Sequence, residues 1–229
     1  MRLKGKSLVL VAAMVLSACA GSSDEPLGAM QLERTSDDGV VTVVRGDDSF
    51  QVEEDFDLEP GDIVSTSEDA TAMLRLEGEG QTVSLGPATQ VAVVGDVGID
   101  ARSGSILVSA GRPTEVSFGD EVATAESGLF RLDRTSTTTR VGTYSGEVSV
   151  ASPGERPRTV QRLFQVSVAA GDISAPRPYQ LGPSDGWDRE HLGDVADLDQ
   201  ELERLAAGFS NQIKRRDADL DLVRAATGR

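Results

Sequence analysis

The sequence GDIVSTSEDATAMLRLE, residues 61–77, contains the pattern that decides the fold. It opens with a Gly-Asp turn, runs through a short strand-like segment to Thr66, turns, and resumes in a second, alternating run. Such alternation is typical of a β-strand with one buried face. The layout recurs in GDEVATAESGLFRLD, residues 119–133, and a shorter echo begins at Gly171. Two related units predict that each supplies one face of a shared hydrophobic core.

Short runs of the same kind continue on both sides of this repeat, from residue 39 to residue 175. Val, Ala, Thr, Ser and Gly dominate this region, which favours strands and tight turns over helix. The strand candidates are Val40–Arg45, Ile63–Thr66, Ala72–Leu76, Thr82–Leu85, Gln90–Val94, Ser105–Ala110, Thr114–Phe118, Glu121–Thr124, Leu129–Asp133, Thr138–Thr143, Glu147–Val150 and Leu163–Val168. Close strand spacing is typical of a sandwich, a barrel or a coiled β-solenoid. We predict an all-β domain over residues 39–175, either a two-sheet sandwich or a short β-solenoid-like domain.

The character of the sequence changes after Pro176 and Pro178, and residues 176–229 read as a Pro-containing linker followed by a helical segment. Apolar residues recur there at spacings of three and four, which predicts an amphipathic C-terminal α-helix over Leu192–Phe209. They are Leu192, Val195, Leu198, Leu202, Leu205 and Phe209. Ser184 or Asp185 is expected to cap the helical segment. Its apolar face either packs against the β domain or docks a partner, and both remain open.

The first 18 residues have the layout of a secretory signal peptide, with a basic start, a short apolar run and small residues before Cys19. The apolar run, Leu8–Leu16, is too short to span a bilayer. Residues 16–19, Leu-Ser-Ala-Cys, resemble a bacterial lipobox, which implies cleavage before Cys19 and diacylglycerol on its sulfur. Residues 19–38 are then a lipidated N-terminus and flexible tether. We expect a lipid-anchored protein at the cell membrane, facing the periplasm or the cell exterior.

The composition limits the partners of such a protein. The chain has 22 Lys and Arg against 38 Asp and Glu, a net charge of −16, and removal of the three basic signal residues makes this −19. A chain this acidic is not expected to bind nucleic acid. Cys19 is the only cysteine, so no intramolecular disulfide can form and the domain depends on its core.

The β region resembles a FecR-type extracytoplasmic domain over residues 39–150. The segments that carry the resemblance are GVVTVVRG (39–46), LEPGDIVSTSEDATAMLRLEG (58–78), VSLGPATQVAV (83–93), SGSILVSAG (103–111), VATAESGLFRL (122–132) and TRVGTYSGEVSV (139–150). The resemblance implies an envelope sensor of the kind that passes a signal to a sigma factor. Signalling members of that family carry a cytoplasmic segment and a spanning helix where this chain has a signal peptide and lipobox. The implied form is therefore a stand-alone bacterial lipoprotein, with only the extracytoplasmic half of the role.

Residues suited to catalysis or metal binding are few. His191 is the sole histidine, and no serine lies in a Gly-x-Ser-x-Gly elbow. The acidic run at residues 53–59 is expected to be a solvated loop, with loose calcium binding as the alternative. The Asp217, Asp219 and Asp221 pattern lacks the Gly and Glu of a calcium loop. The sequence predicts no catalytic, cofactor or metal site.

These observations favour a membrane-anchored, non-enzymatic lipoprotein that serves as a sensing or protein-interaction module of the cell envelope. Its expected partners are the membrane, through acylated Cys19, and an envelope protein, with the helix Leu192–Phe209 as one docking surface. A structural protein that binds cell-wall polysaccharide is the alternative. A carboxylate-dependent hydrolase is a third, weaker one, since no pair of acidic residues stands out.

Overall fold

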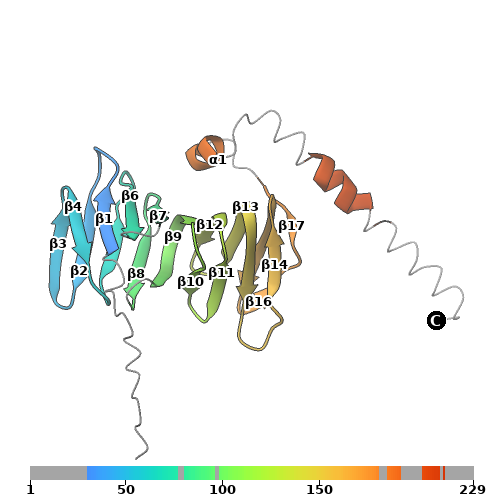
Figure 1. Cartoon of the computed structure of the whole chain (residues 1–229), viewed down its shortest axis with the longest axis horizontal. Coiled ribbons are helices and arrows are strands. Elements are labelled where there is room, and N and C mark those ends of the chain that lie inside the picture. The colour runs from blue at the N-terminus through green and yellow to red at the C-terminus, as the bar shows by residue number, and fades with distance from the viewer. Residues whose placement is uncertain are drawn as a thin grey trace, which may run out of the picture.

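The computed structural model describes residues 30–76, 80–95, 98–180, 185–191, 203–211 and 214. Seventeen strands make up most of these residues, and they are followed by a short helix, α1 (Gly186–His191), and a second helical stretch at residues 203–211. Figure 1 shows the strands side by side in an elongated body. The expectation of a mostly β protein with a helical C-terminal segment is confirmed in this coarse form.

The strands pair in two ladders, and every pair is antiparallel except β9 with β10. Ladder A runs in the spatial order β4 (Asp55–Leu58), β1 (Met30–Arg34), β6 (Ala72–Leu76), β7 (Gln81–Leu85), β9 (Gly98–Ala110), β12 (Gly128–Arg134), β13 (Thr139–Ala151) and β15 (Phe164–Ala169), with β16 (Asp172–Ile173) and β17 (Arg177–Pro178) on the outer rim of β15. Ladder B runs β3 (Asp48–Val52), β2 (Val41–Arg45), β5 (Ile63–Thr66), β8 (Gln90–Val94), β9, β10 (Thr114–Phe118), β11 (Glu121–Ala125), β13 and β14 (Arg158–Gln161).

Two long strands join the ladders. β9 and β13 each have 13 residues, and each pairs in ladder B over one part and in ladder A over the other. Gly104 in β9 and Gly146 in β13 lie where the pairing changes, with φ angles of 85° and 78°. A Cβ on Gly104 would lie 2.4 Å from the Thr89 hydroxyl oxygen, and one on Gly146 would lie 2.4 Å from the Ser127 carbonyl oxygen. Only glycine combines this backbone conformation with such close approach.

The joined ladders contain a small closed barrel. The pairings β9–β10, β10–β11, β11–β13, β13–β12 and β12–β9 return to their starting strand and so close a ring of five strands. The remaining strands extend the two ladders away from this ring. Neither the expected sandwich nor the expected solenoid describes this arrangement by itself.

The sequence repeat takes a different place from the one expected. In the first copy β5 lies in ladder B and β6 in ladder A, and in the second copy β11 lies in ladder B and β12 in ladder A. Each copy therefore contributes a strand to both faces of the core, and the prediction that each copy supplies one face is wrong. The physical reason is that the turn between the two strands of a copy carries the chain from one ladder to the other.

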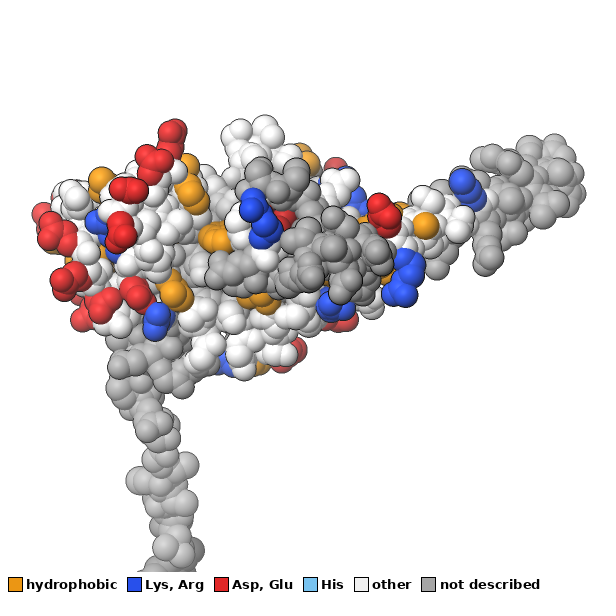
Figure 2. All heavy atoms as spheres, turned by 90° about the horizontal axis from the view of Figure 1, so that it is seen from above, with side chains coloured by type: hydrophobic (Ala, Val, Ile, Leu, Met, Phe, Trp, Pro, Cys, Tyr) orange, Lys and Arg blue, Asp and Glu red, His pale blue; other side chains and the backbone are white. Residues whose placement is uncertain are grey.

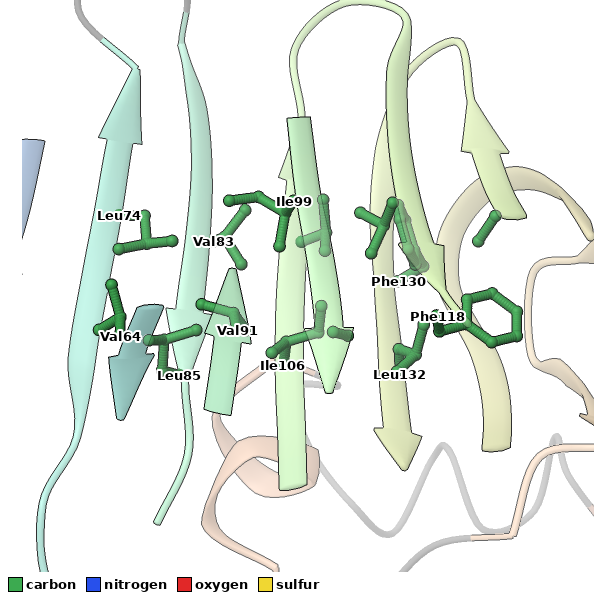
Figure 3. Packing of buried hydrophobic residues seen from close by; sticks show 14 of the residues in the cluster. Val64, Leu74, Val83, Leu85, Val91, Ile99, Ile106, Phe118, Phe130 and Leu132 are labelled. Atoms are coloured by element: carbon green, nitrogen blue, oxygen red, sulfur yellow. The ribbon is translucent and has the colours of Figure 1, made fainter. Parts of the chain in front are cut away.

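The core lies between the ladders and is made of the inward-pointing, alternate residues of their strands. Leu74, Val83 and Leu85 reach it from ladder A, and Val64 and Val91 reach it from ladder B (Figure 3). Phe118 and Phe130, each almost fully buried, fill the part inside the five-strand ring. Burial of this apolar surface drives folding, in agreement with a domain that has no disulfide to rely on.

Several strands differ from the sequence prediction: β3, β14, β16 and β17 were not expected, and β9 begins at Gly98 and not at Ser105. Residues 30–34, placed in the flexible tether over 19–38, form β1, whose Leu32 is fully buried between β4 and β6. Part of the acidic run at residues 53–59 is strand β4 and not a loop. The two strands expected at 138–143 and 147–150 are one strand, β13. Pairing partners distant in sequence stabilise β1 and β4, whose own residues are too polar to show a clear strand pattern.

Candidate functional site

The outer face of ladder A, which points away from the main core, carries a second, smaller group of buried residues. Leu107, Tyr144, Leu163 and Tyr179 form it, and Leu129, Trp187 and Leu205 pack against it. Trp187 belongs to α1 and Leu205 to the helical stretch at 203–211, so both helical segments contact this face. The contact made by Leu205 agrees with the first of the two expectations for the apolar helix face, namely packing on its own β domain.

Charged side chains lie under α1 on the same face. The Arg131 guanidinium in β12 donates to Asp133 at 2.7 Å and, across 54 residues of sequence, to Asp185 at 2.6 Å. Asp133 also accepts from the Ser105 hydroxyl at 2.6 Å and from Arg140 at 2.5 Å. Arg131 has only 8% of its side chain exposed. A guanidinium buried to this extent is stable only when carboxylates surround it.

Asp188 in α1 completes this arrangement. Its Oδ1 accepts hydrogen bonds from the Tyr144 hydroxyl at 2.5 Å and the Tyr179 hydroxyl at 3.0 Å, and lies 3.3 Å from Arg131 Nη1. The side chain of Asp188 is 3% exposed. We call Arg131, Asp133, Arg140, Tyr144, Tyr179, Asp185 and Asp188 the latch, because together they hold α1 on the sheet.

The environment of the latch shifts the pKa values of its groups. Burial by itself would raise the pKa of Asp133, but the charge of Arg131 and the hydrogen bonds from Ser105 and Arg140 lower it below the usual range. Burial opposes the charge of Arg131, yet Asp133 and Asp185 raise its pKa further. Burial, and next the neighbouring Tyr179, raises the pKa of Tyr144, and burial likewise raises that of Tyr179. The latch is therefore a set of fixed ion pairs with two neutral phenols.

Local sequence explains how α1 is positioned for this role. Asp185 Oδ1 accepts from the backbone N–H groups of Trp187 and Asp188, at 3.0 and 3.3 Å, so it caps the helix. This confirms Asp185 as a cap. Tyr179 fits because Gly142 in β13 has no side chain: a Cβ there would lie 2.2 Å from the Tyr179 ring.

A groove of about 840 Å³ lies beside the latch on the same outer face. None of the residues that line it is charged, and six of them carry a hydroxyl group. The lining residues are Thr35, Thr71, Ala72, Met73, Thr82, Ser84, Leu85, Leu107, Ser109, Ala110, Gly128, Leu129, Ser145 and Trp187. Trp187, whose ring lies 5.5 Å from the Arg131 guanidinium, forms the boundary between the groove and the latch. The arrangement suits binding of an uncharged ligand surface and offers no group for acid–base chemistry.

The residues singled out by sequence lie mostly elsewhere. Cys19 and the signal peptide lie outside the described residues, as do residues 192–202 and Asp217, Asp219 and Asp221. His191 is the last residue of α1. The acidic run at residues 53–59 is fully described, and no group of three potential metal ligands occurs there or in the other described residues. None of the described helices is both long and apolar enough to cross a membrane.

The latch and the groove were not found by sequence reasoning. The one local sign of the latch is RLD at residues 131–133, where two charged residues share the outward side of a strand. Outward charges on a strand normally face water, and two partners of Arg131, Asp185 and Asp188, lie 54 and 57 residues further along the chain. The groove has no sequence signature, because its lining residues come from seven separate parts of the chain that only folding brings together.

The protein is thus mostly β, with a small barrel, and the outer face of its ladder A carries a latched helix and an uncharged groove. No protein-family model matches the chain, and no curated protein is similar to it. Two crystal structures of a "putative anti-sigma factor" from Parabacteroides distasonis, at 2.50 and 1.65 Å resolution, are distantly similar, with a TM-score of 0.43 and 18% and 17% sequence identity. The similarity covers 52% of this chain and 60% of theirs.

Proposed function

We propose that this protein is a membrane-anchored, extracytoplasmic lipoprotein of the FecR-like kind, and that it acts without catalysis as a protein-interaction module of the cell envelope. The groove on ladder A binds a segment of an envelope partner. The observation that carries the proposal is the groove itself, which is uncharged in an otherwise strongly acidic chain and bounded by a latched tryptophan.

The groove supports binding because its chemistry differs from that of the surrounding surface. Its floor combines the apolar Leu107 and Leu129 with hydroxyl groups such as Ser84 and Ser109, which can donate and accept hydrogen bonds. Sites of this size usually combine an apolar lining with a few polar groups that fix orientation. The latch fixes Trp187 at one end, so this part of the site needs no ordering when a partner binds.

The test is photo-cross-linking in cells. A photoreactive amino acid at Thr82, on the groove, is expected to give one discrete protein adduct, whereas the same group at Glu115, on the outer side of ladder B, should give none. Occlusion by Ser109→Trp should abolish the adduct, while Thr159→Trp on exposed β14 leaves it unchanged. An adduct that survives occlusion of the groove contradicts the proposed binding site.

Cell-wall polysaccharide is a second candidate ligand. The six hydroxyl groups of the groove favour it, together with Trp187, whose ring could stack against a sugar face. The same experiment separates the candidates. If the adduct at Thr82 is removed by glycan hydrolases and not by proteases, the ligand of the groove is a polysaccharide.

The membrane anchor is tested separately. Mass spectrometry of the mature N-terminus should show acylated Cys19 as the first residue, and Cys19→Ser should release the protein from the membrane. A chain that retains residues 1–18 with an unmodified Cys19 contradicts the lipoprotein assignment.

A further inference from the structure

The two ends of the β body differ in how their strand edges are covered. At one end, β15 has β16 and β17 on its outer rim. At the other end, and within the described residues, β3 pairs only with β2 and β4 only with β1. The outer rims of β3 and β4 therefore present backbone N–H and C=O groups that no strand of the body uses (Figure 1).

This open end also carries an exposed aromatic side chain. Phe50 in β3 is 39% exposed. Every other aromatic side chain among the described residues is buried or partly buried. Its ring centroid lies 5.6 Å from that of Phe56 in β4, and the Arg45 guanidinium lies 5.4 Å from the Phe56 ring. A partly exposed aromatic fixed by its neighbours is the kind of residue that dominates binding energy in protein interfaces.

Acidic groups surround this aromatic pair. Arg45 is the nearby cation, and it is already held by Asp62 and Glu59, each at 2.7 Å. Six exposed carboxylates of the same end form no ion pair with any described residue: Asp47, Asp48, Glu53, Glu54, Asp55 and Asp57. Figure 2 shows the red side chains gathered at this end of the body.

We infer that the edge formed by β3 and β4 binds an extended, basic polypeptide segment of a partner protein by strand addition. The open rim supplies main-chain hydrogen bonds, Phe50 supplies the apolar contact, and the carboxylates select Lys and Arg beside it. A second copy of this chain is disfavoured, because two such acidic edges repel each other. The groove on ladder A takes no part in this interaction. A negative result at the β3–β4 edge therefore does not contradict the proposed binding at the groove.

The test uses the full chain and a fluorescent probe peptide of alternating Lys and Val, six residues long, with binding followed by anisotropy. We expect saturable binding that weakens as salt rises and that is absent for the corresponding Glu and Val peptide. Methylation of alternate backbone nitrogens of the Lys and Val peptide should weaken binding at least tenfold, because it removes the donors needed for strand pairing.

Variants of the chain locate the site. Phe50→Thr, which keeps a strand-forming residue, should weaken binding about tenfold. Val94→Thr, a matched change at another exposed apolar residue, should have no effect, and the groove-filling Ser109→Trp should also leave peptide binding intact. Equal binding of the methylated and unmethylated peptides would show that charge attraction holds the peptide and that no strand pairing occurs. Absence of binding would show that the acidic edge serves only to prevent strand pairing, and either result overturns the inference.

Discussion

The outer face of ladder A has two halves that contrast in chemistry although the same sheet forms both. Over β12 and β13 most outward residues beside α1 are charged or phenolic, namely Arg131, Asp133, Arg140 and Tyr144. Over β6, β7 and β9 they are mainly small, with hydroxyl or apolar side chains, and form the groove. This difference shows that the polarity of a strand's outward residues does not predict whether another element covers that face of the sheet. The charged half is the buried one, because Asp188 in α1 and Asp185 just before it provide counter-charges for Arg131.

The strongest test of this contrast compares two outward arginines of ladder A. Arg131→Met should lower the free energy of unfolding by about 3–5 kcal/mol, because it leaves the buried Asp188 and the partly buried Asp133 and Asp185 without the cation they share. Arg75→Met removes the pair with Glu33 on the other half, where 52% of the arginine side chain is exposed, and should cost less than about 1 kcal/mol. Urea unfolding of both variants measures the difference. Equal costs would contradict the distinction between the two halves.

The next effect concerns the space that Gly142 leaves for Tyr179. Gly142→Ala is expected to cost about 1–3 kcal/mol, because the new Cβ would overlap the Tyr179 ring and push it out of the latch. Gly186→Ala is the matched control. Nothing lies within 4 Å of a Cβ there, and alanine at the start of α1 should be neutral or slightly stabilising. Thermal unfolding followed by circular dichroism compares the two variants, and an unchanged Tm for Gly142→Ala would show that Tyr179 is not tightly packed.

A smaller effect is expected from the ionisation of the phenols. Tyr144 and Tyr179 are the only tyrosines of the chain, and the fold raises the pKa of both. Their contribution to stability is therefore complete below the unfolded-state pKa of about 10 and is lost as pH rises toward the folded values. Tyrosinate absorbance at 295 nm should appear only together with unfolding, above pH 10. Titration of either tyrosine near pH 10 in a chain that keeps its native circular dichroism would show that the latch is open to solvent.

The smallest effect should be found in the groove. Thr82→Ala and Ser109→Ala remove partly exposed hydroxyl groups and should change the free energy of unfolding by no more than about 0.5 kcal/mol. With the photoreactive amino acid at Thr82, Ser109→Ala should also weaken capture of the cross-linked partner. A large loss of stability would instead show that these hydroxyl groups serve to stabilise the fold.

Part of this architecture could be predicted from the sequence because it depends on local signals. Alternation located most of the strands, and the position before a helical segment narrowed the helix cap to Ser184 or Asp185, of which the structure shows Asp185 in that role. β1 was missed because Met30–Arg34 lies in a polar stretch, and only its pairing with β4 and β6 reveals it as a strand. The latch was missed for the same physical reason, since Arg131 meets Asp185 and Asp188 across more than 50 residues.

The sequence by itself determined the β class of the body, the helical character of its C-terminal part and the acidic charge, and it predicts the lipid anchor at Cys19. Periodicity, turn residues and composition are local properties, so they can be read without a structure. Only the tertiary structure decided that the repeat spans both ladders, that β9 and β13 close a barrel, and that one half of the outer face is covered while the other remains a groove. These features depend on contacts between residues far apart in the chain, which folding alone brings together.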